Sequence, residues 1–294
     1  MSIKTTEPNP QRMYPTPPYP EQEQEYPGFE SQMEPRPEFG KDIYKGSAKL
    51  LDKVALITGG DSGIGRAVAT LYAKEGADIV ISYLSEHEDA EETRKVVESA
   101  GRRCILIPGD IRDKSHCKAI IDETISHFGS IDILVNNAAF QRSVKGIAEV
   151  TEEDLDRTFR TNIYAIFFLT QAAFPHMNEG GSIINTASIQ AYQPSSSLLA
   201  YAATKAGIVN FTRGFAQEAI GKGIRVNTVA PGPVWTPLIP ATMGKSSTKN
   251  FGRDTLFGRT AQPIELATIY VFLASNDASY VTGQVYGATG SGMP

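Results

Sequence analysis

The sequence predicts an α/β protein built on a doubly wound, Rossmann-like parallel sheet of about seven strands, with helices on both faces. From residue 53 onward, short apolar runs alternate with longer helical patterns, which is typical of βαβ units. A glycine-rich turn, Thr58-Gly-Gly-Asp-Ser-Gly-Ile-Gly65, joins the first apolar run to the first helical pattern. Such units predict one parallel sheet with right-handed crossovers.

The elements are expected in this order along the chain. The expected strands cover 54–57, 78–82, 104–107, 131–135, 181–187, 224–229 and a short run near 284–286. The expected helices cover 67–75, 86–100, 114–128, 152 to about 176, the stretch after Leu199, and 264–274. No short-period repeat and no second globular domain is visible, so residues 49–294 are predicted to form a single domain.

Residues 1–48 differ in composition from everything that follows. They hold half of the chain's 18 prolines, and proline favours extended or irregular backbone because it lacks an amide hydrogen. The interleaved aromatic residues Tyr14, Tyr19, Tyr26 and Phe29 are unusual for a linker. We therefore expect this Pro-rich arm to lie along the globular surface or a neighbouring subunit. The alternative is a ligand for the aromatic-lined groove of an adaptor protein.

The composition excludes several classes of function. A net charge of −5 without a basic block argues against a nucleic-acid surface. Cys104 and Cys117 are too few for a disulfide framework or a metal cluster, and the four histidines show no metal-ligand grouping, so no metal is expected. Neither a signal peptide nor an apolar run long enough to span a bilayer is visible, so the expectation is a soluble cytoplasmic protein without membrane contact.

Tyr201 and Lys205 are the first candidates for catalysis. At i and i+4 of an expected helix they share one face, and an ammonium near a phenol should lower the pKa of the phenol. Such a phenol can act as a general acid and base. Ser188 stands at the carboxyl end of the preceding expected strand. With 12 tyrosines, chance alone supplies about one such pair, so the interpretation depends on a cofactor site elsewhere.

The glycine turn is the expected cofactor site. Gly59, Gly63 and Gly65 allow tight backbone conformations and the close approach of a pyrophosphate, which the amides at the start of the next helix can hold. The alternative is that the glycines only reverse the chain. A strand before the turn and a helix after it favour the dinucleotide site.

Several motifs together resemble the short-chain dehydrogenase/reductase family over residues 49–294. Thr58 to Gly65 matches the family's Thr-Gly-x-x-x-Gly-Ile-Gly fingerprint, and Asn136-Asn137-Ala138-Ala139 resembles its Asn-Asn-Ala-Gly, with Ala139 in place of glycine. The motifs Gly109-Asp110 and Pro231-Gly232 follow strands where the family has them. Within the family, the arm, Gly60-Asp61-Ser62 and the stretch 188–195 resemble bacterial general-stress oxidoreductases and the related aldehyde reductases.

The resemblance implies hydride transfer between NAD(P) and a carbonyl or alcohol, with definite roles for named residues. Tyr201 would give or take the proton, Ser188 would hydrogen-bond the reacting oxygen, Lys205 would hold the ribose hydroxyls, and Asn162 would position a water in a proton relay. The expected cofactor-binding residues are Gly59, Asp61, Ser62, Gly63, Ile64, Gly65, Ser82, Tyr83, Asp110, Ile111, Asn137, Ala138, Tyr201, Lys205, Pro231, Gly232, Val234 and Thr236.

The choice between NAD and NADP depends on the end of the second strand. An acid there normally selects NAD, whereas the sequence reads Ser82-Tyr83-Leu84-Ser85. No arginine stands in this run to hold a 2′-phosphate, although Arg66 is close in sequence. The missing acid favours NADP over NAD.

The expected substrate contacts are Ser188, Gln190, Tyr192, Tyr201 and Trp235. The walls should come from residues 140–142, 190–193 and 235–259, the last of which has the composition of a mobile lid. The pocket should be partly apolar and suit an aldehyde, ketone or secondary alcohol; alternatively, these residues only pack the lid. The resemblance also implies a homotetramer or dimer. Two other functions stay open: a non-catalytic dinucleotide sensor or scaffold, and an interaction protein that uses its arm.

Overall fold

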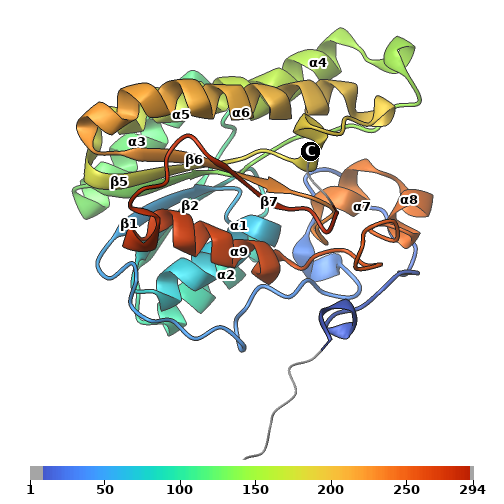
Figure 1. The fold of residues 1–294 in the computed structure, drawn as a ribbon, viewed down its shortest axis with the longest axis horizontal. Helices are drawn as coiled ribbons and strands as arrows, with labels where there is room; N and C mark the ends of the chain where they lie inside the picture. Colours follow the sequence, from blue (N-terminus) through green and yellow to red (C-terminus); the bar gives the residue numbers. More distant parts are fainter. Residues whose placement is uncertain (1–8, 292–294) are drawn as a thin grey trace, which may run out of the picture.

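The sheet of the computed structural model, which describes residues 9–291, contains seven parallel strands in the order β3-β2-β1-β4-β5-β6-β7 (Figure 1). The strands are β1 (Val54–Thr58), β2 (Asp78–Tyr83), β3 (Cys104–Pro108), β4 (Ile131–Asn136), β5 (Met177–Thr186), β6 (Arg225–Pro231) and β7 (Val285–Ala288). This confirms the predicted fold class. Each expected strand exists, and its bounds differ from the expectation by a few residues.

Helices cover both faces of the sheet (Figure 1). One layer holds α1 (Gly63–Lys74), α2 (His87–Ser99) and α9 (Pro263–Ala274), and the other holds α3 (Lys114–Phe128), α4 (Glu152–Phe159), α5 (Ala165–Ala173) and α6 (Leu199–Ala219). Successive side chains of a strand point to opposite faces. Accordingly, Ala55 and Ile57 of β1 pack against the first layer, and Leu56 packs against the second.

The helix expected from residue 152 to about 176 is interrupted. Between α4 and α5 the chain makes a π-helical turn, η4 (Arg160–Tyr164), which holds Asn162. Such turns insert an extra residue into a helix and are common at functional sites. The helical pattern in the sequence is correct, but periodicity alone does not reveal the turn.

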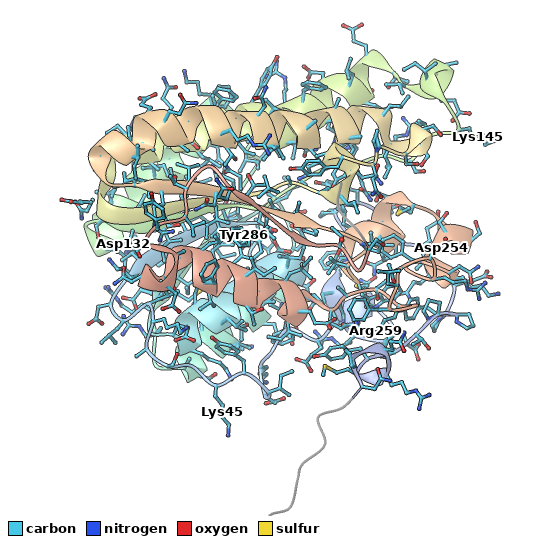
Figure 2. The ribbon with its side chains drawn as sticks, viewed as in Figure 1. Lys45, Asp132, Lys145, Asp254, Arg259 and Tyr286 are labelled. Atoms are coloured by element: carbon cyan, nitrogen blue, oxygen red, sulfur yellow. The ribbon has the colours of Figure 1, made fainter. Side chains whose placement is uncertain are left out.

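The described part of the arm, residues 9–48, lies along the surface of the same chain. Tyr19 and Met33 are each 3% exposed and form a small buried cluster with Trp235. The rings of Tyr19 and Trp235 are 4.3 Å apart, and Trp235 Nε1 donates to the Pro35 carbonyl at 2.7 Å. Arg259, beside the first turn of the arm in Figure 2, donates to the Pro10 carbonyl at 2.7 Å. The first eight residues expected in the arm, and the last three expected in the domain, lie outside the described range.

The segment expected to act as a lid lies beside this arm. It forms two short helices, α7 (Leu238–Thr242) and α8 (Lys245–Lys249). The backbone amides of Tyr19 and Gln24 donate to the carbonyls of Lys249 at 2.9 Å and Pro240 at 3.0 Å. The arm is thus hydrogen-bonded to both helices.

The strand order reverses between β1 and β4, because β2 and β3 extend to one side of β1 while β5, β6 and β7 extend from β4. In doubly wound sheets, ligands bind beyond the carboxyl ends of the strands at such a point. Among the described residues, no helix has the length and hydropathy needed to cross a membrane.

Candidate active site

A cavity lies at the carboxyl ends of the strands and collects most of the residues predicted from sequence. Of the expected cofactor residues, the following line it: Gly59, Asp61, Ser62, Gly63, Ile64, Ser82, Tyr83, Asp110, Ile111, Asn137, Ala138, Tyr201, Lys205, Pro231, Gly232, Val234 and Thr236. Of the expected substrate residues, Ser188, Gln190 and Tyr201 line it. The residues thus come from the loops after six different strands.

The glycine turn is held in shape by the loop after β4. Thr58 Oγ1 accepts hydrogen bonds from the amides of Asn137 at 3.0 Å and Ala138 at 3.1 Å. The Asn137 side chain donates back to the carbonyls of Thr58 and Gly59, each at 3.2 Å. A Cβ on Gly65 would lie 1.8 Å from the Gly59 carbonyl oxygen. Gly65 therefore does not line the cavity but permits the turn to close.

The unpaired hydroxyl of Ser82 shows that the cavity suits a dinucleotide. Ser82 is 1% exposed, and its Oγ has no hydrogen-bond partner among the described residues. A buried hydroxyl without a partner is costly unless a ligand satisfies it, and a ribose hydroxyl would do so. The amino end of α1 faces the same cavity and favours a pyrophosphate. The residues present therefore fit a nicotinamide dinucleotide.

Two carboxyl groups line the cavity near Ser82, a feature that the linear order of residues conceals. Asp61 comes from the glycine turn, and Glu86 precedes α2. Burial, and then the neighbouring Glu86 carboxylate, raise the pKa of Asp61 to about 7. Burial likewise raises the pKa of Glu86. The sequence lacks an acid at the end of β2, but the fold brings two acids to the same cavity.

Arg66 does not face the cavity and cannot hold a 2′-phosphate there. Its side chain is fully buried and donates to Glu30 Oε1 at 2.7 Å, to the Asp89 carbonyl at 2.8 Å and to the Asp61 carbonyl at 2.9 Å. The role of Arg66 beside the glycine turn is therefore structural: it forms a buried ion pair with Glu30.

Tyr201, Ser188 and Lys205 meet in the cavity as expected from their spacing. The Ser188 hydroxyl lies close enough to the Tyr201 hydroxyl to act on the pKa of the phenol, which it lowers. Lys205 Nζ lies 5.2 Å from the centre of the Tyr201 ring and donates to the Thr186 carbonyl at 2.7 Å. Helix α6 places Tyr201 and Lys205 one turn apart, and the end of β5 places Ser188 opposite them.

The pKa values of this pair differ from the expectation. Burial raises the pKa of Tyr201 to about 12, although the Ser188 hydrogen bond acts in the opposite direction. Burial lowers the pKa of Lys205 to about 7. The spacing predicts that the Lys205 ammonium lowers the pKa of Tyr201. Without a bound dinucleotide, burial has the larger effect and raises this pKa, because Lys205 is itself buried and holds its charge less readily.

Asn162 lies next to the site but does not line the cavity. Its amide donates to the Phe140 carbonyl at 2.8 Å and to Thr204 Oγ1 at 3.0 Å, and its Oδ1 accepts from the Phe140 amide at 2.8 Å. The π-helical turn thus joins the loop after β4 to α6. A place in a proton relay stays a prediction for this residue.

Two expected substrate residues lie outside the cavity. Trp235 is 0% exposed and packs against the arm, and Tyr192 packs against a separate apolar cluster under α6. For Trp235 this corrects the expectation of a substrate contact, because the ring and its Nε1 are both used by the arm. Among residues 9–291, no three His, Cys, Asp or Glu side chains are grouped to hold a metal ion.

Sequence reasoning missed cavity residues that come from distant segments. Tyr26 and Pro27 of the arm line the cavity, as do Glu86 and Arg157. The aromatic residues among the prolines were a signal for packing, but they did not indicate what the arm packs against.

The comparisons with known proteins agree with this geometry. A family model described as "Enoyl-(Acyl carrier protein) reductase" matches residues 59–290. General stress protein 39 of Bacillus subtilis (strain 168) is 52% identical over 264 residues, which make up 90% of this chain and 92% of that protein. The protein of Arabidopsis thaliana named "NADPH-dependent aldehyde reductase 1, chloroplastic" is 51% identical over 274 residues, 91% of this chain and 95% of that protein.

A solved short-chain dehydrogenase from Burkholderia cenocepacia J2315, in complex with NADP, has a TM-score of 0.78 and 33% identity, and the match covers 83% of this chain and 98% of that one. These relatives confirm the resemblance to stress-type oxidoreductases and aldehyde reductases. The protein is an enzyme that uses NAD(P) to interconvert carbonyl and alcohol groups. The extent of these matches places the chain in the short-chain dehydrogenase/reductase family.

Proposed function

We propose that Tyr201 is the general acid and base of this oxidoreductase and that an aldehyde is its preferred carbonyl substrate. The observation that carries the first part is that Tyr201, Ser188 and Lys205 line the same cavity as the glycine turn, with Lys205 Nζ 5.2 Å from the centre of the Tyr201 ring. The apolar side chains of Ile189, Leu198, Ile239, Met243 and Phe251 also line this cavity and support a partly apolar substrate. The printed name of the Arabidopsis relative supports the choice of an aldehyde.

Each side chain has its own role in the proposed reaction. When bound, the reduced nicotinamide supplies the hydride. Tyr201 Oη gives the carbonyl oxygen its proton, and burial, which raises the pKa of Tyr201 to about 12, keeps the phenol protonated until that transfer. Ser188 Oγ donates to that oxygen as negative charge develops on it. Lys205 would hold the ribose hydroxyls, and Asn162 keeps the loop at Phe140 in place beside the cavity.

For the cofactor we propose NADP over NAD. The printed names of the Arabidopsis relative and of the Burkholderia complex support NADP. The carboxyls of Asp61 and Glu86 are the feature of this cavity that opposes a 2′-phosphate. Titration with both reduced dinucleotides measures the preference, and tenfold tighter binding of NADH would overturn this part of the proposal.

The Tyr201→Phe variant tests the mechanism. It removes the transferable proton and keeps the ring, so we expect reduction of a panel of aldehydes to fall by at least about 10²-fold while dinucleotide binding persists. Turnover is followed by absorbance at the reduced-nicotinamide band. Activity within a few-fold of the natural chain would contradict the role of Tyr201. A panel in which ketones or sugars react faster than aldehydes would contradict the substrate class.

We further propose a homotetramer in the cytoplasm, without nucleic-acid or membrane partners. Exposed aromatic side chains at the end of η4 and on α5 support assembly through this surface, with Tyr164 44% and Phe167 51% exposed. The free cysteines Cys104 and Cys117 support a reducing compartment. Light scattering coupled to size exclusion measures the subunit number, and a monomeric mass would contradict the assembly.

A further inference from the structure

Residues 24–31 of the arm lie beside the cavity, which Tyr26 and Pro27 line, and contact helix α7 and two of the surrounding loops. The Gln24 amide donates to the Pro240 carbonyl of α7 at 3.0 Å. Tyr26 reaches the loop after β4, and Glu30 reaches the glycine turn after β1. The matching family model begins at residue 59, so these residues precede the part of the chain that it describes.

Glu30 is buried against the amino end of α1. Its Oε2 accepts from the Gly63 amide at 2.6 Å, and its Oε1 accepts from Arg66 Nη1 at 2.7 Å. Glu30 is 0% exposed, so these bonds are shielded from water. Arg66 in turn donates to the Asp61 carbonyl at 2.9 Å. Glu30 therefore fixes the glycine turn at two points, directly at Gly63 and through Arg66 at Asp61.

A second set of contacts holds Glu30 in place. The carboxylate of Asp89 in α2 accepts from the backbone amide of Glu30 at 2.6 Å and from that of Ser31 at 3.3 Å. Asp89 also lies 3.3 Å from Arg66 and is fully buried. The arm, α1 and α2 thus share one buried set of charges. Their positions depend on one another, because breaking such a set leaves an uncompensated charge inside the protein.

Tyr26 forms part of the cavity wall itself. Its ring meets the Phe140 ring edge-on, with centres 5.0 Å apart, and the Arg157 guanidinium lies 4.6 Å from the centre of the Tyr26 ring. The Tyr26 hydroxyl donates to the Ala139 carbonyl at 3.4 Å. Tyr26, Ala139 and Arg157 all line the cavity. An aromatic ring so placed offers a large apolar face to a ligand in the cavity.

We propose that the arm is a working part of the dinucleotide site: Tyr26 contacts the bound dinucleotide, and Glu30 positions the glycine turn that holds it. The inference rests on the proposed function only in requiring that the cavity binds a nicotinamide dinucleotide. It does not depend on the role of Tyr201 or on the substrate.

Equilibrium binding to the full-length chain tests the proposal without turnover. Titration with NADPH and NADH, followed by nicotinamide fluorescence, gives Kd for the natural chain and for Tyr26→Ala and Glu30→Gln. We expect Kd to rise about tenfold in each variant, because one loses a ring that contacts the ligand and the other loses the charge that pairs with Arg66. The KM for the dinucleotide should rise in the same proportion.

Two arm variants away from the cavity serve as matched controls. Tyr14 packs against Arg259, and the exposed Glu21 pairs with Lys249 at 3.1 Å; neither lines the cavity. Tyr14→Ala and Glu21→Gln should bind the dinucleotide within twofold of the natural chain. Thermal melting of all variants, done in parallel, separates binding from folding.

The outcomes separate this inference from the proposed function. If the natural chain binds a dinucleotide and folded Tyr26→Ala binds it within twofold, the inference is wrong and the proposed function stands. If Glu30→Gln melts earlier but binds with unchanged Kd, Glu30 is only structural and its part of the inference is wrong. If Glu30→Gln does not fold, Tyr26→Ala decides the inference. A natural chain that binds neither dinucleotide would overturn both proposals.

Discussion

Lys205 is a buried base with little to offset its charge. The side chain is 2% exposed, and its ammonium donates to the Thr186 carbonyl at 2.7 Å. Burial lowers its pKa from 10.5 to about 7. In the unfolded chain the amine keeps its proton up to about pH 10.4. Folding therefore either removes the proton that the solvated amine would hold or buries the charged ammonium, and this site is destabilising at neutral pH.

The Lys205→Met variant should make this effect measurable. The destabilisation is absent above the unfolded pKa of 10.5, grows as the pH falls toward about 7, and is complete below that value. In the absence of a dinucleotide, we expect the variant to be more stable than the natural chain at pH 6, by on the order of a few kcal/mol, and the gain to shrink toward pH 10. Urea unfolding at both pH values measures it, and turnover should be lost.

Lys222→Met is the control for this comparison. Lys222 also donates to a backbone carbonyl, that of Phe174 at 2.7 Å, but its side chain is exposed. Its replacement should change stability equally at both pH values. If Lys205→Met shows the same pH dependence of stability as the natural chain, burial of Lys205 does not have the effect described above.

At the scale of elements, the site depends on the close approach of Gly65, at the end of the turn after β1, to Gly59 at its start. The Gly59 carbonyl leaves no room for a side chain at Gly65, and Asn137 ties the start of the turn, at Thr58 and Gly59, to the loop after β4. Helix α1 begins within this turn, at Gly63, and its first amide is held by Glu30. A change in the turn therefore alters the position of the helix end that favours the pyrophosphate.

Gly65→Ala tests this dependence. The new methyl would lie 1.8 Å from the Gly59 carbonyl oxygen and 2.9 Å from Asn137 Nδ2, so the turn has to open. We expect a loss of at least about 1–3 kcal/mol of stability, typical of overpacking, and a rise in the dinucleotide Kd of at least tenfold. Gly146→Ala is the control, because nothing lies within 4 Å of its Cβ position. Unchanged binding by Gly65→Ala would show that the turn tolerates opening.

At the scale of the whole molecule, one outer face carries apolar side chains that the single chain leaves uncovered. Tyr164 of η4 and Phe167 and Phe168 of α5 line a shallow hollow. Phe167 is 51% exposed and lies 4.5 Å, ring centre to ring centre, from Phe211 of α6. Exposed apolar patches of this kind mark interaction surfaces. Helix α6 also carries Tyr201 and Lys205, so a partner on this face would also support the site.

Phe167→Glu should weaken the proposed assembly. A carboxylate at the centre of an apolar interface loses its hydration without a partner, so we expect the particle mass to fall to half or less of that of the natural chain. Leu256→Glu is the control, since Leu256 is 76% exposed but lies beside the arm, away from α5. Light scattering at several concentrations measures the mass. An unchanged mass for Phe167→Glu would contradict assembly through α5.

The amino-acid sequence by itself determined the features that depend on neighbours along the chain. Alternating strand and helix patterns, the glycine turn, and the spacing of Tyr201 and Lys205 are all set by local periodicity and backbone preference. They were sufficient to predict the parallel sheet and a dinucleotide site at the glycine turn. The family resemblance supplied most of the residues expected to line that site. The family resemblance supplied the roles of Ser188 and Asn162.

The tertiary structure alone decided which distant groups meet. It turned Trp235 toward the arm, enclosed Arg66 with Glu30 and Asp89, and brought Asp61 and Glu86 into one cavity. It also set the balance by which burial, rather than the neighbouring ammonium, governs the pKa of Tyr201. Burial and charge pairing depend on distances in space between residues far apart in sequence, and local sequence patterns do not predict those distances.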